Sequence, residues 1–430
     1  MIYRSTNKLS PNVDFREAAV TGLAPDNGLF FPIEVPVLSP EFLKDLKNKS
    51  KAQVAFEIVE PYVGSAIPKA DLFKICEETI DFEFPLVKIK ENIYSLELFH
   101  GPTLAFKDVG ARFLSRCLGY FSKESNKKTT VLVATSGDTG SAVANSFLGV
   151  EGVDVVILYP SGKVSVIQEL QLTTLGNNIS ALEIQGDFDD CQRMVKEAFA
   201  DQELNEKLNL TSANSINIAR WLSQQFYYFF ALQQWPHAKP PVISVPSGNF
   251  GNICAGLIAN KSGLPVTKFI AACNSNDAFY DYLQSGDYKT KPSVATISNA
   301  MDVGNPSNFV RVLELFDNDF NQLKDTISSY KVSDETTKET ISKVKKEFGY
   351  LLDPHGAVAY HALQEYLKLN PNEKGFILET AHPVKFNNVV EPIIGKEIEI
   401  PDSVKELLKK SKLSKLISPK FEVLKEVLLG

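Results

Sequence analysis

Cysteine and histidine are scarce in this sequence, and neither is spaced as a set of ligands. The 430 residues include five cysteines and five histidines, with no CxxC, HxxxH or HExxH pattern. An odd number of cysteines without paired spacing argues against a disulfide framework and against a zinc ribbon. We therefore predict a reducing compartment, the cytoplasm, and no metal site.

Long hydrophobic runs and a strong charge of one sign are missing as well. The longest clean apolar run, residues 226–232, is far too short to cross a bilayer, and the first residues lack the apolar core of a signal peptide. The formal net charge of −7 offers no excess of positive charge for nucleic acid or an anionic membrane, so we expect neither partner. An apolar content of 44% is that of an ordinary folded protein, and the length suggests two or three domains.

Short apolar segments alternate with helical patterns from about residue 128 onward. The expected strands are 129–134, 153–159, 179–184, 241–246, 268–273 and 375–380. Strands of this kind beside helices predict βα units and parallel sheets with helices on both faces, and they are enough for two sheets. Ligands of such sheets gather at the loops that leave the carboxyl ends of the strands.

Two of these loops are rich in glycine and polar residues. Residues 135–141 read TSGDTGS and residues 247–252 read SGNFGN, and a helical pattern follows each. Free amides at a helix start bind anions, and small residues let a ligand come close. An ordinary turn with a good N-cap explains the first loop equally well, and it lacks the lysine of the GxxxxGK[ST] phosphate loop. Two such loops together favour a ligand with more than one anionic group.

Lys107 stands in an unusual place for a lysine. It lies between Phe106 and Asp108, where the helical pattern of residues 108–121 begins. Apolar neighbours and the positive potential of a helix start both lower the pKa of an amine, and a Schiff-base nucleophile needs the neutral amine. The alternative is a lysine whose head reaches solvent. A nucleophilic lysine with two anion-binding loops fits pyridoxal phosphate, which needs a lysine for its aldehyde and amides for its phosphate.

Seven motifs in order resemble the threonine synthase family, pyridoxal-phosphate enzymes of the tryptophan-synthase-β-like fold (fold type II). They are GLAPDNGLFFP (22–32), HGPTLAFKD (100–108), ATSGDTGSA (134–142), YPSGKVSVIQELQLTT (159–174), NSINIAR (214–220), PSGNFGN (246–252) and ETAHPVKF (379–386). The resemblance implies an α/β fold with two parallel-sheet domains, helices on both faces of each sheet, and a small N-terminal domain. The bounds it implies are 1–90 for the N-terminal domain, 91–110 with 200–390 for the large cofactor domain, 111–199 for the small domain, and 391–430 for a C-terminal helical tail.

The resemblance also implies a role for individual residues. Lys107 corresponds to the catalytic Schiff-base lysine, and Thr380 to the hydroxyl residue that meets the pyridine nitrogen. The cofactor phosphate is expected on the main chain of Gly248, Asn249, Phe250, Gly251 and Asn252. The substrate is expected to face Ser136, Gly137, Asp138 and Thr139, where many relatives of this fold have Asn in place of Asp138. The substrate phosphate is expected to meet Asn214, Ser215, Arg220 and Lys163.

Without the family pattern, a surface salt bridge would explain Arg220 as well. His355 and His382 are expected to be structural rather than acid–base residues.

The reaction that the resemblance implies converts O-phospho-L-homoserine and water to L-threonine and phosphate. It proceeds by γ-elimination and β-addition of water with pyridoxal 5'-phosphate, and it is the last step of threonine biosynthesis. Two alternatives remain open: a phospho-lyase that releases 2-oxobutyrate, and a non-catalytic binding protein of the same fold. The expected partner is a small-molecule substrate, bound by a monomer or small homo-oligomer.

Overall fold

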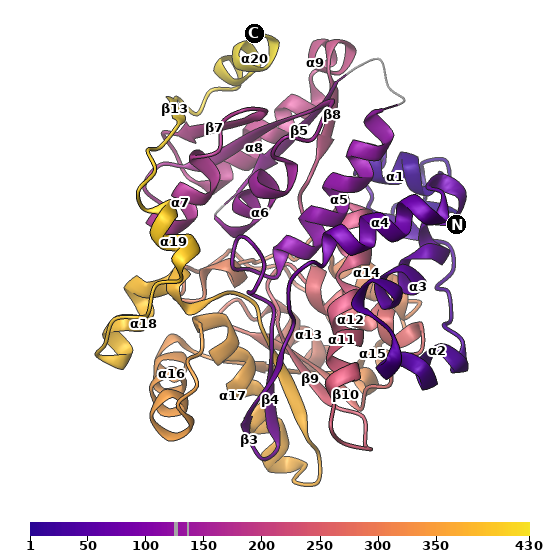
Figure 1. Cartoon of the computed structure of the whole chain (residues 1–430), viewed down its shortest axis with the longest axis vertical. Coiled ribbons are helices and arrows are strands. Elements are labelled where there is room, and N and C mark those ends of the chain that lie inside the picture. Colours follow the sequence, from indigo (N-terminus) through magenta and orange to yellow (C-terminus); the bar gives the residue numbers. More distant parts are fainter. Residues whose placement is uncertain (124–127, 136) are drawn as a thin grey trace.

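The computed structural model describes residues 1–123, 128–135 and 137–430. Two sheets with helices on both faces form the body of the molecule, and a helical N-terminal region packs beside them (Figure 1). The N-terminal region contains a two-stranded antiparallel sheet, β1 (Tyr3–Ser5) with β2 (Phe30–Pro32). Its helices are α1 (Phe15–Thr21), α2 (Pro40–Asp45), α3 (Lys51–Val63) and α4 (Lys69–Thr79).

The smaller sheet lies in the upper part of Figure 1 and is parallel throughout. Its strands, in spatial order, are β13 (Ser414–Ile417), β7 (Ile179–Ile184), β6 (Val153–Pro160), β5 (Thr129–Ala134) and β8 (Asn209–Ser212). Side chains of β5 alternate between two cores, because Val131 and Val133 pack in one cluster and Leu132 in another. Helices therefore cover both faces, as the continuous apolar run of β5 predicts. They are α5 (Lys107–Ser122), α6 (Asp138–Phe147), α7 (Val166–Thr173), α8 (Phe188–Ala200) and α9 (Gln202–Lys207).

The larger sheet is parallel except for one edge hairpin. Its spatial order is β11 (Ile327–Lys331), β10 (Lys268–Cys273), β9 (Val242–Pro246), β12 (Gly375–Glu379), β4 (Ile93–Glu97) and β3 (Leu86–Lys90). The helices that follow along the chain are α10 (Ile218–Ser223), α11 (Gln225–Gln234), α12 (Gly251–Lys261), α13 (Ala278–Ser285), α14 (Phe309–Leu315), α15 (Phe320–Thr326), α16 (Asp334–Phe348) and α17 (Pro354–Leu369). All six expected strands are present within one residue at each end. No described helix is long and apolar enough to span a bilayer.

The C-terminal segment runs from the large sheet to the small one (Figure 1). It comprises a short 3-10 helix η4 (Pro383–Phe386), α18 (Asn387–Ile394), α19 (Asp402–Leu407), β13 and α20 (Phe421–Leu429). The expected helical tail thus also contains a strand, which adds to the edge of the small sheet beside β7. The four residues of β13 are too few to show the alternation of a strand in the sequence, so this strand was not expected.

Candidate functional site

Lys107 is the first residue of α5, and two main-chain hydrogen bonds hold its loop against the segment that follows β12. The amide of Phe106 donates to the Thr380 carbonyl over 2.9 Å, and the amide of His382 donates to the Leu104 carbonyl over 3.0 Å. Leu104 has a left-handed φ of 58°, which turns the chain into the helix. Lys107 is therefore placed by the end of a central strand, at the carboxyl edge where the sheet is expected to bind ligands.

The amine of Lys107 is poised for nucleophilic chemistry. It makes no hydrogen bond or ion pair with any residue that the structure describes, and it lies 5.9 Å from the centre of the Phe106 ring. Desolvation lowers the pKa of Lys107 to about 8; the Asp138 carboxylate opposes this, and the nearby cations Arg220 and Lys385 add to it. A neutral amine is therefore much more accessible near pH 7 than in an ordinary lysine.

The loop between β9 and α12 presents a row of unused main-chain donors. Within the described residues, no amide from 248 to 253 donates a hydrogen bond. Phe250 precedes the helix in the left-handed conformation, with a φ of 61°, so the loop folds back on itself. A Cβ on Gly248 would lie 2.6 Å from the Cα of Met301, so this position has no room for a side chain. Such a buried set of amides at a helix start suits a phosphate group.

The side chains of this loop hold its shape. The amide nitrogen of Asn249 donates to the Ser215 hydroxyl over 2.8 Å, which ties the loop to the segment that leads into α10. The carbonyl oxygen of Asn252 accepts from the hydroxyls of Tyr227 and Tyr228 at 2.7 and 2.8 Å. The expected cofactor contact of this loop, through its main chain, is therefore compatible with where its side chains lie.

The loop between β5 and α6 is organised by Thr135. Its hydroxyl oxygen accepts from the amides of Gly137 and Gly140 at 3.0 and 2.8 Å, and Gly137 has a φ of 141° that favours glycine. The amides of Asp138 and Thr139 donate to no described residue. Two unused donors at a helix start suit an anion, which is compatible with the substrate role expected of this loop. Ser136, the remaining substrate candidate of this loop, lies outside the described residues.

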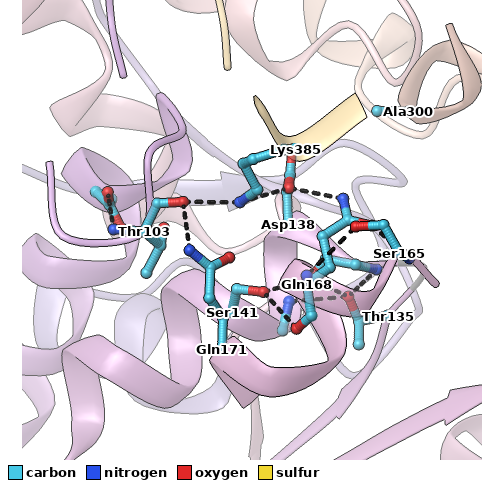
Figure 2. A network of polar contacts seen from close by, with 12 residues as sticks. Thr103, Thr135, Asp138, Ser141, Ser165, Gln168, Gln171, Ala300 and Lys385 are labelled. Atoms are coloured by element: carbon cyan, nitrogen blue, oxygen red, sulfur yellow. Dashed lines mark hydrogen bonds and ion pairs between the residues drawn. The ribbon is translucent and has the colours of Figure 1, made fainter. Parts of the chain in front are cut away.

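Asp138 belongs to a buried charged network with Lys385 (Figure 2). The Lys385 ammonium lies 2.8 Å from Asp138 Oδ1 and donates to the Thr103 carbonyl over 2.7 Å. Gln168, whose side chain also closes a capping box with Ser165 at the start of α7, donates to the same Asp138 oxygen over 2.9 Å. Burial alone would raise the pKa of Asp138, but the cations Lys385 and Lys107 hold it well below its usual range. The carboxylate is therefore fully ionised.

Arg220 is a buried cation without a carboxylate partner among the described residues. Its side chain is 2% exposed, one guanidinium nitrogen donates to the Ala213 carbonyl, and Nε has no partner. Desolvation lowers its pKa to about 10, and the charge of the Asp108 carboxylate opposes this shift. Asp108 is itself occupied, because it accepts from the Thr103 amide and hydroxyl at 2.9 and 2.6 Å. An unneutralised buried arginine is suited to an anionic ligand, and the alternative of a surface salt bridge does not apply.

The remaining predicted residues differ in burial and in hydrogen bonding. Thr380 is buried directly after β12. Lys163 is exposed in the turn after β6, where its main-chain amide donates to the Pro160 carbonyl over 3.3 Å. Asn214 is partly buried, and its amide donates to the Ser212 hydroxyl. His355 accepts from the Ala300 amide over 3.2 Å and His382 from the Val384 amide over 3.1 Å, in keeping with structural roles.

Comparison with known proteins agrees with this geometry. Residues 82–378 match the family "Pyridoxal-phosphate dependent enzyme", residues 2–80 match "Threonine synthase N terminus", and residues 356–428 match "Threonine synthase, C-terminal". The chain is 45% identical to a threonine synthase of Buchnera aphidicola over 97% of both chains. The chain belongs to the threonine synthase family.

Solved structures of the threonine synthase family show the same fold. The Escherichia coli enzyme superposes with a TM-score of 0.93 at 43% identity, covering 100% of this chain and 99% of that one. A pyridoxal-phosphate-bound threonine synthase from Brucella melitensis has a TM-score of 0.93 at 35% identity, covering 100% and 98%. The expected fold and cofactor are thus confirmed.

The residues present fit pyridoxal phosphate. The unused amides of residues 248–253 match its phosphate, the unpaired amine of Lys107 matches its aldehyde, and the buried hydroxyl of Thr380 is available for its ring nitrogen. The loop between β9 and α12 has no room for a side chain at Gly248, so no side chain covers the amides there. These three features lie at the carboxyl ends of adjacent strands, β9 and β12, and at the loop after β4.

Two buried cations of this threonine synthase family member received no role from the sequence. Lys385 lies within the motif ETAHPVKF, but its partner Asp138 is far away in the chain. Arg311 donates to the carbonyls of Phe30 and Ile216 and stacks 4.5 Å from the Trp221 ring centre. The only signal for either was a basic residue inside an otherwise apolar segment.

Proposed function

We propose that the protein converts O-phospho-L-homoserine and water to L-threonine and phosphate. The observation that carries this proposal is the presence of three separate anion sites around Lys107. They are the amides of residues 248–253, the amides of Asp138 and Thr139, and the guanidinium of Arg220. A cofactor phosphate and an amino-acid carboxylate account for two of them. The third, a full charge, calls for a substrate with a second strong anion, such as a phosphate ester.

Electrostatic coupling supports the convergence of these sites. Arg220, Asp138 and Lys385 all act on the pKa of Lys107, so they surround its amine. The hydrogen bond from Asn249 to Ser215 places the segment that leads to Arg220 beside the cofactor loop. The two phosphates would thus be bound close together but by different groups, one by neutral amides and one by a cation.

The roles of the chain's residues follow from this arrangement. Pyridoxal phosphate, when bound, withdraws electrons from the substrate so that protons can leave Cα and Cβ. The Lys107 amine, neutral above a pKa of about 8, takes the Cα proton and later returns one. Arg220 holds the phosphate at Cγ, and its attraction grows as charge builds on the departing group. The amides of Asp138 and Thr139 hold the α-carboxylate at the start of α6.

Product analysis tests the proposal. Proton and phosphorus NMR of purified holoenzyme with phosphohomoserine should show L-threonine and inorganic phosphate appearing in equal amounts. Release of 2-oxobutyrate and ammonia instead would identify a phospho-lyase and overturn the proposal. A protein with no visible cofactor absorption and no turnover would be a non-catalytic relative.

We also place the protein in the cytoplasm, as a monomer or a small homo-oligomer. All five cysteines are buried free thiols, which supports a reducing compartment. Analytical ultracentrifugation measures the assembly state.

A further inference from the structure

Lys385 is a completely buried ammonium that joins three separate segments of the chain (Figure 2). It lies in η4, shortly after β12. Its Nζ lies 2.8 Å from Asp138, the first residue of α6, and 2.7 Å from the carbonyl of Thr103 in the loop that leads to Lys107. Gln171 of α7 donates to the same Thr103 carbonyl over 3.1 Å. The position of α6 relative to the Lys107 loop therefore depends on this ammonium.

The charge of Asp138 poses a problem for substrate binding. Its ionised carboxylate stands at the same helix start whose free amides are proposed to take the substrate carboxylate. Two carboxylates at the same helix start repel each other, most strongly where water is excluded. An asparagine would avoid the repulsion, and so would a cation fixed on the aspartate. Lys385 is that cation, and Gln168 adds a neutral donor to the same oxygen at 2.9 Å.

We propose that Lys385 is a positioning residue for recognition of the substrate carboxylate. Its ammonium cancels the charge of Asp138 and anchors the first turn of α6 against Thr103, so that no uncompensated negative charge lies beside the amides of Asp138 and Thr139. The proposal deepens the function proposed above and rests on it. It predicts that losing Lys385 weakens binding of a ligand carboxylate because the charge of Asp138 is left unpaired.

The test measures ligand binding to the holoenzyme, not turnover. L-Threonine and its alcohol analogue L-threoninol are titrated while the visible absorption of the bound cofactor is followed. The alcohol keeps the amine and side chain but lacks the carboxylate. The variants are Lys385→Met, Asp138→Asn, the double variant, and Lys396→Met as a control at an exposed lysine of the same segment.

Lys385→Met should weaken L-threonine about a hundredfold and L-threoninol less than threefold, because the unpaired aspartate repels only the carboxylate. Asp138→Asn should keep the preference for L-threonine, since an asparagine oxygen can still accept from Lys385. The double variant should restore L-threonine binding to within about tenfold of the unchanged enzyme. Lys396→Met should bind both ligands normally.

Equal weakening of both ligands by Lys385→Met, without rescue by Asp138→Asn, would show that Lys385 only supports the fold. Unchanged binding in Lys385→Met would overturn the proposal as well. Should Lys385→Met fail to fold, the double variant decides, because it leaves no unpaired charge at position 138 or 385. Loss of the L-threonine preference in a folded double variant would refute the proposal. Turnover of phosphohomoserine by the unchanged enzyme tests the proposed function separately.

Discussion

Replacing Arg220 with methionine should make the substrate-free enzyme more stable while removing most of its activity. Arg220 is 2% exposed and has no carboxylate partner among the described residues. Its folded pKa of about 10 lies below the ordinary 12.5, so at every pH below 10 the charged side chain opposes folding. Each pH unit by which a pKa falls corresponds to about 1.36 kcal/mol, so the opposition is about 3 kcal/mol.

Methionine fills a similar volume without a charge. The hydrogen bond to the Ala213 carbonyl is lost, and this loss offsets about 1–2 kcal/mol of the stability gained by removing the charge. The free energy of unfolding should therefore rise by about 1–2 kcal/mol, in line with other replacements of buried charges by apolar residues. Because Arg220 is proposed to stabilise the departing phosphate, kcat/KM for phosphohomoserine should fall by roughly two to four orders of magnitude.

A matched control is available in Arg311. It is also fully buried with a pKa lowered to about 10, but it donates to two carbonyls and to the Asn308 side chain and stacks on Trp221. Arg311→Met leaves these acceptors unpaired, so it should lower the free energy of unfolding. Urea denaturation compares the two variants, and steady-state kinetics compares phosphohomoserine with an uncharged homoserine ester.

The reasoning fails if Arg220→Met destabilises the protein as much as Arg311→Met does. It fails equally if activity falls by the same factor on the charged and the uncharged substrate, since Arg220 would then support the fold without binding the phosphate. Cofactor content, read from visible absorption, should stay normal in Arg220→Met.

Four further substitutions test the cofactor site and its support. Lys107→Ala should lose the visible absorption of bound cofactor and all turnover while keeping its circular dichroism. In the unchanged chain stripped of cofactor, the rate of pyridoxal-phosphate uptake should rise with pH and level off above about 8, since only the neutral amine reacts. Gly248→Ala should lower both the melting temperature and cofactor affinity, because its Cβ meets the main chain of a neighbouring turn at 2.6 Å. Gly251→Ala, with its nearest contact at 3.4 Å, should lower cofactor affinity alone. Equal cofactor affinity in the two variants and the unchanged protein would contradict the phosphate role. Gly356→Ala should reduce stability by about 1–3 kcal/mol in urea denaturation, because its Cβ overlaps the buried carboxylate of Glu379.

Six strands of the two sheets could be predicted because most of their residues are buried. TTVLVA at 129–134 is apolar throughout its centre, and the structure places β5 on those residues. The hairpin of β3 and β4 was not predicted, because IYSLE carries a buried serine and LVKIK a lysine in the middle. Such strands mix polar and apolar residues without a clear alternation, so periodicity does not distinguish them from a loop.

The site was predictable where its chemistry is local. Apolar neighbours in the sequence already indicated a lowered pKa for Lys107, and the structure agrees in direction. The cations that contribute to it, Arg220 and Lys385, come from distant segments that only the fold brings together. Lys385 received no role because its pairing with Asp138 joins the segment that follows β12 of the large sheet to the helix that follows β5 of the small sheet. Lys163 stays a prediction, since the structure places it in an exposed turn.

The order of strands in the larger sheet has a consequence for synthesis of the chain. β4, which leads to Lys107, has β12 as its inner neighbour, and the hydrogen bonds that position the lysine loop come from Thr380 and His382. A nascent chain on the ribosome thus displays its lysine and its glycine-rich loops long before the segment that aligns them emerges. Pairing so distant along the chain is slow to form. A growing polypeptide should therefore bind pyridoxal phosphate only at the end of translation, and a chain ending before residue 375 should lack the visible absorption of bound cofactor.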